Sequence, residues 1–225
     1  MKKILFAIST AVLISACGGG DTATAEKPKQ DSVKPEVCTY SYDSSATTIG
    51  FGAFKFTEKK EVKGGFLKFD ISGVKQISTD SIRDFACDKI FEGAQFTIDV
   101  EGLDTKDQAR DFNIKSTFFK VMDSTSFITG KVLKVEPDSS EHGLMTVLFK
   151  LNNVEKEIKL AYEKNESDAS FNFTGTINLN DFKAQKALAS LNTTCKDLHK
   201  GSDGKSVTWP EVNIYVSTTL KKNCK

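Results

Sequence analysis

The residues best able to do chemistry in this chain are its cysteines and histidines. They are Cys17, Cys38, Cys87, Cys195, Cys224, His142 and His199. No two cysteines form a C-x-x-C pair and only two imidazoles are available, so these residues predict no metal site. Neither histidine stands in the serine, cysteine or carboxylate context of a catalytic group. The chain also lacks a nucleophile elbow, a phosphate loop and a zinc-protease motif. We therefore expect a protein that is not an enzyme and has no cofactor.

The N-terminus has the pattern of an export signal. Met1-Lys2-Lys3 is basic, an apolar run of about 11 residues follows, and small residues precede Cys17. This run is shorter than the roughly 20 apolar residues that span a bilayer. The ending Ile14-Ser15-Ala16-Cys17 resembles a bacterial lipobox, whose cysteine receives a diacylglyceryl group and becomes the new N-terminus. We predict a signal peptide at 1–16 and a lipidated Cys17; an ordinary signal peptide with an incidental cysteine is the alternative.

Residues 17–36 are predicted to contain the lipidated cysteine and a flexible tether. The segment after Cys17 is rich in Gly, Thr, Lys, Asp and Pro without apolar periodicity, so it cannot bury enough surface to fold. Residues 37–225 then suit one domain. The charges of the whole chain nearly balance, with 31 Lys+Arg against 30 Asp+Glu, which indicates no nucleic-acid surface. We expect a membrane-anchored protein that faces the periplasm, and Gly18 suggests the outer membrane.

Most of the domain alternates apolar and polar residues with the period of two that predicts β-strands. Eight strands are expected, at 49–56, 65–71, 96–101, 127–135, 145–151, 158–162, 171–179 and 212–217. Each has one apolar and one polar face, as a closed antiparallel barrel with a solvated outside requires; a two-sheet sandwich has the same pattern. Asn152-Asn153 is a predicted hairpin turn. Residues 104–121 and 181–191 break the pattern and are expected to contain short helices, the second with Asp181 as N-cap.

An ordered set of motifs resembles the YceI-like family. The motifs are Val62-Lys63-Gly64-Gly65-Phe66, Phe96-Thr97-Ile98-Asp99-Val100 leading to Asp104-Thr105, Ala109-Arg110-Asp111-Phe112-Asn113-Ile114-Lys115-Ser116-Thr117-Phe118-Phe119, Phe127-Ile128-Thr129-Gly130-Lys131-Val132, Gly175-Thr176-Ile177-Asn178-Leu179-Asn180-Asp181-Phe182 and Trp209-Pro210-Glu211-Val212. The resemblance implies an all-β, eight-stranded antiparallel lipocalin-like barrel with one or two short helices, whose apolar interior holds a long isoprenoid or similar lipid. Phe51 stands where the family commonly has tryptophan, and the family's early histidine has no clear counterpart here.

Aromatic residues are weighted toward phenylalanine, with 17 Phe against 4 Tyr and 1 Trp. Phenylalanine has no polar group to satisfy, which suits a dry interior. An eight-stranded barrel is just wide enough to be filled by its own side chains or to hold one small ligand, so each ring could line a site or fill a core. With the family resemblance, we expect a ligand-binding lining that includes Phe51, Phe69, Phe96, Phe118, Phe119, Phe149, Phe171 and Phe173.

The predicted function is to bind an isoprenoid-like or other apolar lipid in the barrel, for sequestration or transport, while anchored to a membrane. The alternative is a non-catalytic envelope-stress or assembly lipoprotein with a filled core, and an enzyme acting on a lipid is a third reading. Arg110-Asp111 either meets a ligand headgroup at the barrel mouth or forms a local ion pair. The sequence predicts no oligomeric state.

The four cysteines after Cys17 predict two disulfides in an exported chain, with three connectivities. Cys38 precedes the first expected strand and Cys224 follows the last. In a closed antiparallel barrel these strands are neighbours, so the two residues can approach disulfide distance. We therefore expect Cys38–Cys224 to close the barrel seam. Cys87 and Cys195 pair by elimination, although either could instead be a free buried thiol.

Overall fold

Residues 37–79, 86–123 and 126–225 are described by the computed structural model of the chain. The predicted signal peptide at 1–16, the lipidated Cys17 and the tether up to residue 36 lie outside the described residues. Strands dominate the described part, as the period-two alternation predicts. None of the helices described there is long and apolar enough to cross a bilayer.

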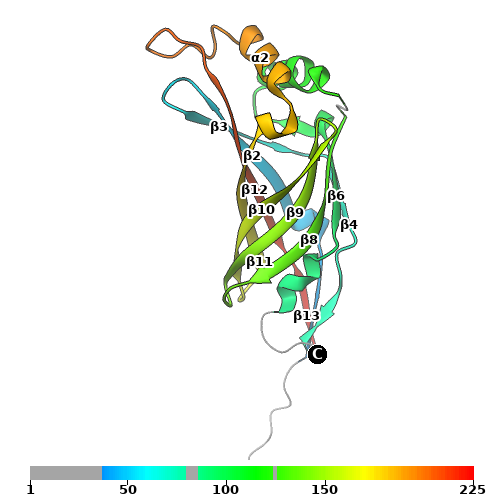
Figure 1. Cartoon of the computed structure of the whole chain (residues 1–225). Coiled ribbons are helices and arrows are strands. Elements are labelled where there is room, and N and C mark those ends of the chain that lie inside the picture. The colour runs from blue at the N-terminus through cyan, green and yellow to red at the C-terminus, as the bar shows by residue number, and fades with distance from the viewer. Residues whose placement is uncertain (1–36, 80–85, 124–125) are drawn as a thin grey trace, which may run out of the picture. The chain divides into compact units, whose positions relative to one another are not determined.

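A large antiparallel sheet curls around the apolar core (Figure 1). Its strands are β2 (Thr47–Lys55), β3 (Lys60–Phe66), β4 (Phe69–Ser72), β6 (Gln95–Asp99), β7 (Leu103–Asp104), β8 (Phe127–Pro137), β9 (His142–Leu151), β10 (Val154–Asn165), β11 (Ser170–Asn178) and β12 (Thr208–Thr219). Short 3₁₀ turns precede β2 and β7, namely η1 (Ser44–Ala46) and η4 (Val100–Gly102). The order across the sheet is β4-β6-β8-β9-β10-β11-β12-β2-β3-β7. Because β12 pairs with β2, the first and last of the eight predicted strands are antiparallel neighbours, as expected.

The strand predicted at 65–71 is two strands in the structure. β3 ends at Phe66 and pairs with β2, whereas β4 begins at Phe69 and pairs with β6. Between them the Leu67 N–H donates to the Gly102 carbonyl at 2.8 Å, and Leu67 is 71% exposed. In the sequence Leu67, Phe69 and Ile71 alternate with polar residues, so a strand through 65–71 would turn all three to the core. For Leu67 this expectation is wrong, because the chain leaves the sheet ladder at this point. Through this link the chain passes from β3, which lies next to one edge strand of the sheet, to β4, which is the other edge strand.

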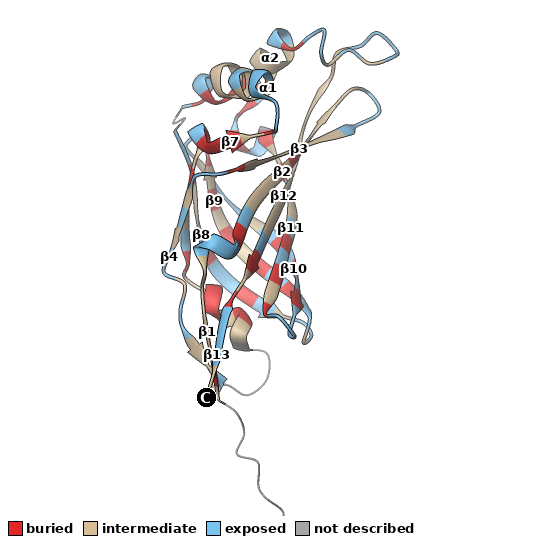
Figure 2. Cartoon of the chain, turned by 180° about the vertical axis from the view of Figure 1, so that it is seen from behind, coloured by how far each residue is buried: buried red, intermediate tan, exposed pale blue. Residues whose placement is uncertain are grey.

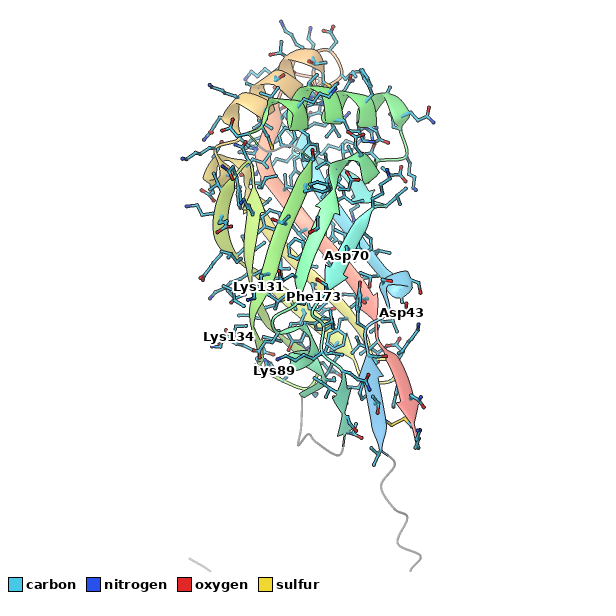
Figure 3. All side chains as sticks on the ribbon, turned by 90° about the vertical axis from the view of Figure 1, so that its right-hand side faces the viewer. Asp43, Asp70, Lys89, Lys131, Lys134 and Phe173 are labelled. Carbon is cyan, nitrogen blue, oxygen red and sulfur yellow. A yellow bond between two sulfur atoms is a disulfide. The ribbon has the colours of Figure 1, made fainter. Side chains whose placement is uncertain are left out.

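Alternation along the strands separates an apolar inner face from a polar outer face. In β9, every second residue from Gly143 to Leu151 is buried. Buried residues line the inside of the sheet in Figure 2. In Figure 3, Phe173 lies inside the curl, while Lys131 and Lys134 lie on its outer side. The curl follows from the pattern, since it removes the apolar face from water at about 25 cal/mol per Å².

The predicted hairpin turn at Asn152-Asn153 is confirmed. Both residues have positive φ, 51° and 57°, and Leu151 pairs with Val154 across the turn. Asparagine tolerates this left-handed conformation, which two-residue hairpins of the primed type require. The Asn152 side-chain amide also donates to the carbonyls of Phe182 at 2.8 Å and Lys183 at 3.0 Å. The hairpin thereby holds the segment that leads into the last helix.

Helices cover one end of the curled sheet, which we name the helical end (Figure 1). They are α1 (Gln108–Asn113), the π-helical turn η5 (Ile114–Phe118), the 3₁₀ turns η6 (Phe119–Val121) and η7 (Leu179–Phe182), and α2 (Gln185–Thr194). The predicted cap of the last helix is wrong. Asp181 lies within η7, whose N-cap is Asn178. Lys183, at φ 54°, interrupts the helical path, so α2 begins only after it.

The opposite end, which we name the disulfide end, is a small sheet with a 3₁₀ helix. Its elements are β1 (Cys38–Ser41), β5 (Ile77–Ser78), β13 (Lys221–Cys224) and η3 (Ala86–Phe91). Cys38 and Cys224 are directly opposite each other in the β1–β13 ladder and form a disulfide. The predicted pairing is confirmed. Its position differs from the expectation, because the bond joins this small sheet and not the β12–β2 seam.

Cys87 and Cys195 are free thiols, so their predicted pairing is wrong. Cys87 lies in η3 at the disulfide end, whereas Cys195 follows α2 at the helical end (Figure 1). The length of the curled sheet separates them, and a disulfide requires Cα atoms within about 7 Å. Elimination failed because an even number of cysteines does not oblige each one to pair; both match the free-thiol alternative.

Candidate ligand-binding site

Two apolar cavities occupy the interior of the curled sheet. The first has a volume of about 110 Å³ and reaches Phe91 near the disulfide end. The second has a volume of about 140 Å³ and reaches Leu188 in α2. Ile49, Ile98 and Phe149 are among the residues that line both cavities, so the two are adjoining parts of one interior. Among the described residues, those that line the two cavities carry no charge.

Six of the eight phenylalanines predicted as lining do face these cavities. Phe96 and Phe173 line the first cavity, Phe51, Phe118 and Phe119 line the second, and Phe149 lines both. The rings come from β2, β6, β9 and β11 and from the turns at the helical end. The sequence pattern therefore brings together side chains that are distant along the chain. Whether they contact a lipid stays a prediction.

Phe69 and Phe171 line neither cavity. Phe171 is 1% exposed and lies in a packed aromatic group. Its ring is stacked with Phe173 at 5.9 Å and meets the edge of Phe91 at 5.1 Å. Tyr162 completes this group. These residues form solid core beside the first cavity, toward the disulfide end.

Glycines on neighbouring strands make room for two of the lining rings. Gly130 in β8 pairs with Phe96 in β6, and a Cβ at Gly130 would collide with the Phe96 ring. Gly64 in β3 pairs with Phe51 in β2, and a Cβ there would lie 2.5 Å from the Phe51 Cζ. Each ring thus occupies space that a side chain on the neighbouring strand would need. Both rings are half-buried, and they pack against Phe66 and Phe149.

Apolar residues of the helices cover the second cavity. Ile114 of η5 and Leu188 and Leu191 of α2 line it. Phe118 and Phe119 pack edge to face at 5.2 Å under the same cover. No disulfide ties these helices to the sheet among the described residues. Apolar side-chain packing therefore accounts for the contact between this cover and the second cavity.

Two aspartates set the start of this helical cover. The Asp107 side chain accepts from the Arg110 N–H at 3.0 Å as the N-cap of α1. The Asp111 carboxylate accepts from the Thr105 N–H at 2.9 Å and from its hydroxyl at 2.6 Å. Arg110 itself forms an ion pair with Asp107 at 3.2 Å. Of the two alternatives for Arg110-Asp111, a local ion pair is present, although its partner is Asp107.

A smaller polar pocket of about 70 Å³ opens beside the second cavity, and we name it the vestibule. Its polar lining residues are Lys55, Thr105, Arg110, Asn113, Cys195, His199 and Thr208. The vestibule and the second cavity share Phe51 and Ile114, so the two adjoin. His199 Nδ1 lies 2.7 Å from the Thr208 hydroxyl. Burial lowers the pKa of His199, and the nearby positive charges of Lys55 and Arg110 add to this effect.

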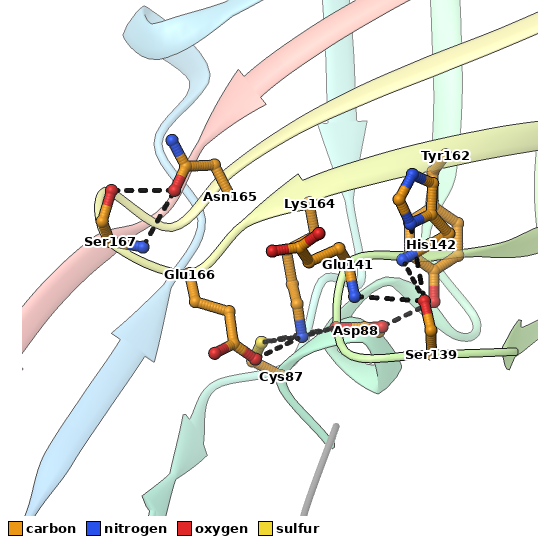
Figure 4. A network of polar contacts seen from close by, with 10 residues as sticks. All are labelled: Cys87, Asp88, Ser139, Glu141, His142, Tyr162, Lys164, Asn165, Glu166 and Ser167. Atoms are coloured by element: carbon orange, nitrogen blue, oxygen red, sulfur yellow. Dashed lines mark hydrogen bonds and ion pairs between the residues drawn. The ribbon is translucent and has the colours of Figure 1, made fainter.

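A buried polar network fills the disulfide end (Figure 4). The Tyr162 hydroxyl donates to Asp88 Oδ2 at 2.5 Å, and Lys164 Nζ forms an ion pair with Asp88 Oδ1 at 3.0 Å. Asp88 is fully buried, and Lys164 also contacts the Cys87 thiol at 3.7 Å. Burial raises the pKa of Tyr162 and of Cys87, the latter to about 11. Burial alone lowers the pKa of Lys164, but the hydrogen bond to Asp88 and nearby acidic groups outweigh it and raise the pKa.

Sequence reasoning missed both the vestibule and this network. Lys164 continues the inward alternation of Leu160 and Tyr162 in β10, which is the signal that could have placed it inside. The vestibule joins β2, α1 and the loop after α2, and no local pattern in the sequence connects these segments. Among the described residues, no group of three or more His, Cys, Asp or Glu could hold a metal ion.

Known structures share this architecture. BcnA from Burkholderia cenocepacia is 15% identical, with a TM-score of 0.55 over 80% of this chain and 99% of its own. A domain from Saccharophagus degradans, described as polyisoprenoid-binding and implicated in plant cell wall breakdown, is 15% identical, with a TM-score of 0.53 over 83% and 98%. At these identities the similarity shows the fold. No curated protein matches the chain.

The family comparison covers most of the chain. The model of the YceI-like domain matches residues 40–220, which includes the whole curled sheet and the helical end. This span also agrees with the ordered motifs from Val62 to Val212 that resemble the family. The chain therefore belongs to the YceI-like domain family.

Proposed function

We propose that this protein binds a long isoprenoid-like or other apolar lipid inside its curled sheet and sequesters or carries it. The observation that carries the proposal is the uncharged apolar interior, in which two cavities adjoin. A lipid chain placed there gains about 25 cal/mol for each Å² of apolar surface removed from water. The relative from Saccharophagus degradans that is described as polyisoprenoid-binding supports this choice of ligand.

The lining must move to admit a long chain. Cavities of about 110 and 140 Å³ are smaller than the 300–1,000 Å³ of typical ligand pockets. Phe51 and Phe96 are half-buried and lie over glycines, so rotation of these rings widens the path between the cavities. The small volumes also favour the second candidate, a non-catalytic envelope-stress or assembly lipoprotein whose core stays filled.

We propose a non-catalytic role for the same interior. Among the described residues, neither cavity is lined by histidine, cysteine, aspartate or glutamate. His142 is exposed at the start of β9, and His199 lies in the vestibule. Turnover of a bound lipid, followed by mass spectrometry of the recovered ligand, is the measurement that would contradict this role.

The anchor is part of the proposal. A lipidated Cys17 and the tether at 17–36 hold the domain at a membrane on the periplasmic side, with the outer membrane favoured by Gly18. Cys17→Ser removes the acceptor thiol, so the protein should leave the membrane fraction and keep an unprocessed N-terminus. A variant that stays membrane-bound with unchanged processing would refute the anchor.

The ligand is tested by native mass spectrometry of delipidated protein with solanesol, a long polyprenol. The wild type should retain one molecule. Ala53→Phe adds a ring to the wall shared by the second cavity and the vestibule, so retention should fall. Ala189→Phe is the matched control, because it adds the same ring to an exposed site on α2. If the wild type retains no lipid, the filled-core candidate is correct; if both variants retain it equally, the lipid is not in this interior.

A further inference from the structure

The vestibule has the charge pattern of an anion site. Lys55 and Arg110 bring two permanent positive charges to a pocket of about 70 Å³, and no carboxylate is among its lining residues. Asp107 is paired with Arg110 at 3.2 Å, and the Asp111 carboxylate is occupied by Thr105. One carboxylate thus offsets two cations at this pocket.

The basic groups of the vestibule affect one another. Burial lowers the pKa of Lys55, and the positive charge of Arg110 lowers it further. Lys55 Nζ donates a 3.4 Å hydrogen bond to the Leu198 carbonyl and lies 4.6 Å from the centre of the Phe56 ring. An anion between Lys55 and Arg110 would relieve their repulsion and replace water lost from both groups.

The position of the vestibule connects this charge to the apolar interior. Phe51, Ala53 and Ile114 line both the vestibule and the second cavity. A ligand with its chain in the second cavity therefore places its end group in the vestibule. A volume of about 70 Å³ replaces roughly five waters, enough for one compact headgroup.

We infer that the vestibule receives the anionic headgroup, phosphate or carboxylate, of an amphiphile whose apolar chain lies in the second cavity. This inference rests on the proposed function, because it names the class of lipid that the same interior takes. The Arg110 guanidinium matches the paired oxygens of either anion, and Lys55 supplies a second charge. The Asn113 amide and the Thr208 hydroxyl can donate to remaining oxygens.

The test compares ligands that share one chain. Geranylgeranyl diphosphate, geranylgeranoic acid and geranylgeraniol all carry the same chain of four prenyl units, but only the first two are anionic. Binding to the delipidated wild type is measured by tryptophan fluorescence, since Trp209 lines the second cavity. At least one anionic ligand should bind about tenfold more tightly than the alcohol, the effect of one charge-assisted hydrogen bond. The stronger of the two anions identifies the headgroup.

Two variants and one control separate the outcomes. Lys55→Gln and Arg110→Gln should remove most of the preference for the anion while leaving the affinity for geranylgeraniol unchanged. Lys186→Gln removes the same charge from an exposed site on α2 and should change neither affinity. Equal binding of anion and alcohol by the wild type, or an equal loss in all three variants, would overturn the vestibule assignment and leave the proposed function standing. No binding of any ligand would overturn the proposed function itself.

Discussion

The two ends of the curled sheet are closed in different ways. At the disulfide end, a covalent bond joins β1 and β13, and Asp88, Tyr162 and Lys164 form a buried ionic network. At the helical end, α2 and η5 cover the interior with side chains such as Leu188 and Ile114, and no covalent bond is described there. The disulfide end is fixed by a covalent bond and a buried ion pair, whereas the described contacts of the helical end are apolar packing and hydrogen bonds such as that from Thr105 to Asp111.

From this difference we expect the disulfide end to stabilise the fold and the helical end to admit and release the lipid. The disulfide keeps β1 and β13 joined, and movement of this end would also have to break the ion pair between Asp88 and Lys164. The apolar contacts of α2 and η5 can separate from the second cavity without breaking a covalent bond or a buried ion pair. The vestibule and the second cavity also lie at the helical end. A ligand should therefore enter there, while the disulfide end keeps the sheet curled.

The largest expected effect is on the disulfide. The bond joins residues separated by 186 positions, and the chain-entropy model gives such a loop about 5 kcal/mol of stabilisation. Cys38→Ser with Cys224→Ser should lower the free energy of unfolding by up to this amount, measured in denaturant without reductant. Lipid binding by the folded fraction should persist, because the bond is remote from the helical end. If the double variant were as stable as the wild type, the disulfide would not be what stabilises this end.

The buried network should give the next largest effect. Asp88→Asn removes the buried charge that pairs with Lys164 at 3.0 Å and accepts the hydrogen bond of Tyr162 at 2.5 Å, which should cost about 3–5 kcal/mol of unfolding free energy. Glu136→Gln breaks the exposed pair with Lys134 and should cost less than about 1 kcal/mol. Equal losses in the two variants would mean that burial does not set the strength of the network.

The same network predicts a loss of stability in alkali. The pKa values of Tyr162 and Lys164 are raised, and that of Cys87 is raised to about 11. Each group therefore holds its proton more tightly when folded. Its contribution is complete below the ordinary pKa, about 9 for the thiol and about 10 for the others, and is lost as pH rises through the folded value. Unfolding curves from pH 8 to 11 should show this loss in the wild type and a shallower one in Asp88→Asn.

Much of the fold follows from the sequence, and the reason is local. Alternation in β9 and β11 sets the strands and their inner faces, and Asn152-Asn153 sets a hairpin, because each depends on neighbouring residues. The prediction of one strand at 65–71 failed at Leu67. The apolar and polar residues keep alternating there, but the backbone leaves the sheet and the Leu67 N–H donates to the Gly102 carbonyl. That bond is made by a residue 35 positions away, which no local pattern reports.

The candidate site was only partly predictable for the same reason. Six of the eight predicted phenylalanines face the cavities, because inward positions follow from strand period. The same period placed Phe171 inside without showing that Phe91 and Tyr162 fill the space around it. Pairing Cys87 with Cys195 failed because a count of cysteines carries no distances.

A smaller effect is expected where glycine meets the lining. Gly130→Ala forces the Phe96 ring away from the wall and toward the first cavity, because a Cβ collides with that ring and lies 2.7 Å from the Leu148 carbonyl. Such overpacking should cost about 1–3 kcal/mol. Solanesol retention should fall as the ring narrows the cavity. Ala161→Gly is the control, because it changes the side-chain volume on the exposed face of β10 without touching the cavity. Gly93→Ala would be unsuitable, because Gly93 has a positive φ.

The smallest expected change in stability is at the helical end. The same substitution there should give the clearest change in the rate of lipid release. Leu188→Ala removes part of the half-buried cover of the second cavity and should cost only about 1 kcal/mol of unfolding free energy. Because the cover opens more often, lipid should be released faster in stopped-flow transfer to vesicles. Leu198→Ala is the control, since Leu198 is 65% exposed and lines no cavity described here. If Leu188→Ala left release unchanged while Cys38→Ser with Cys224→Ser accelerated it, the lipid would pass through the disulfide end, and the assignment of exchange to the helical end would be wrong.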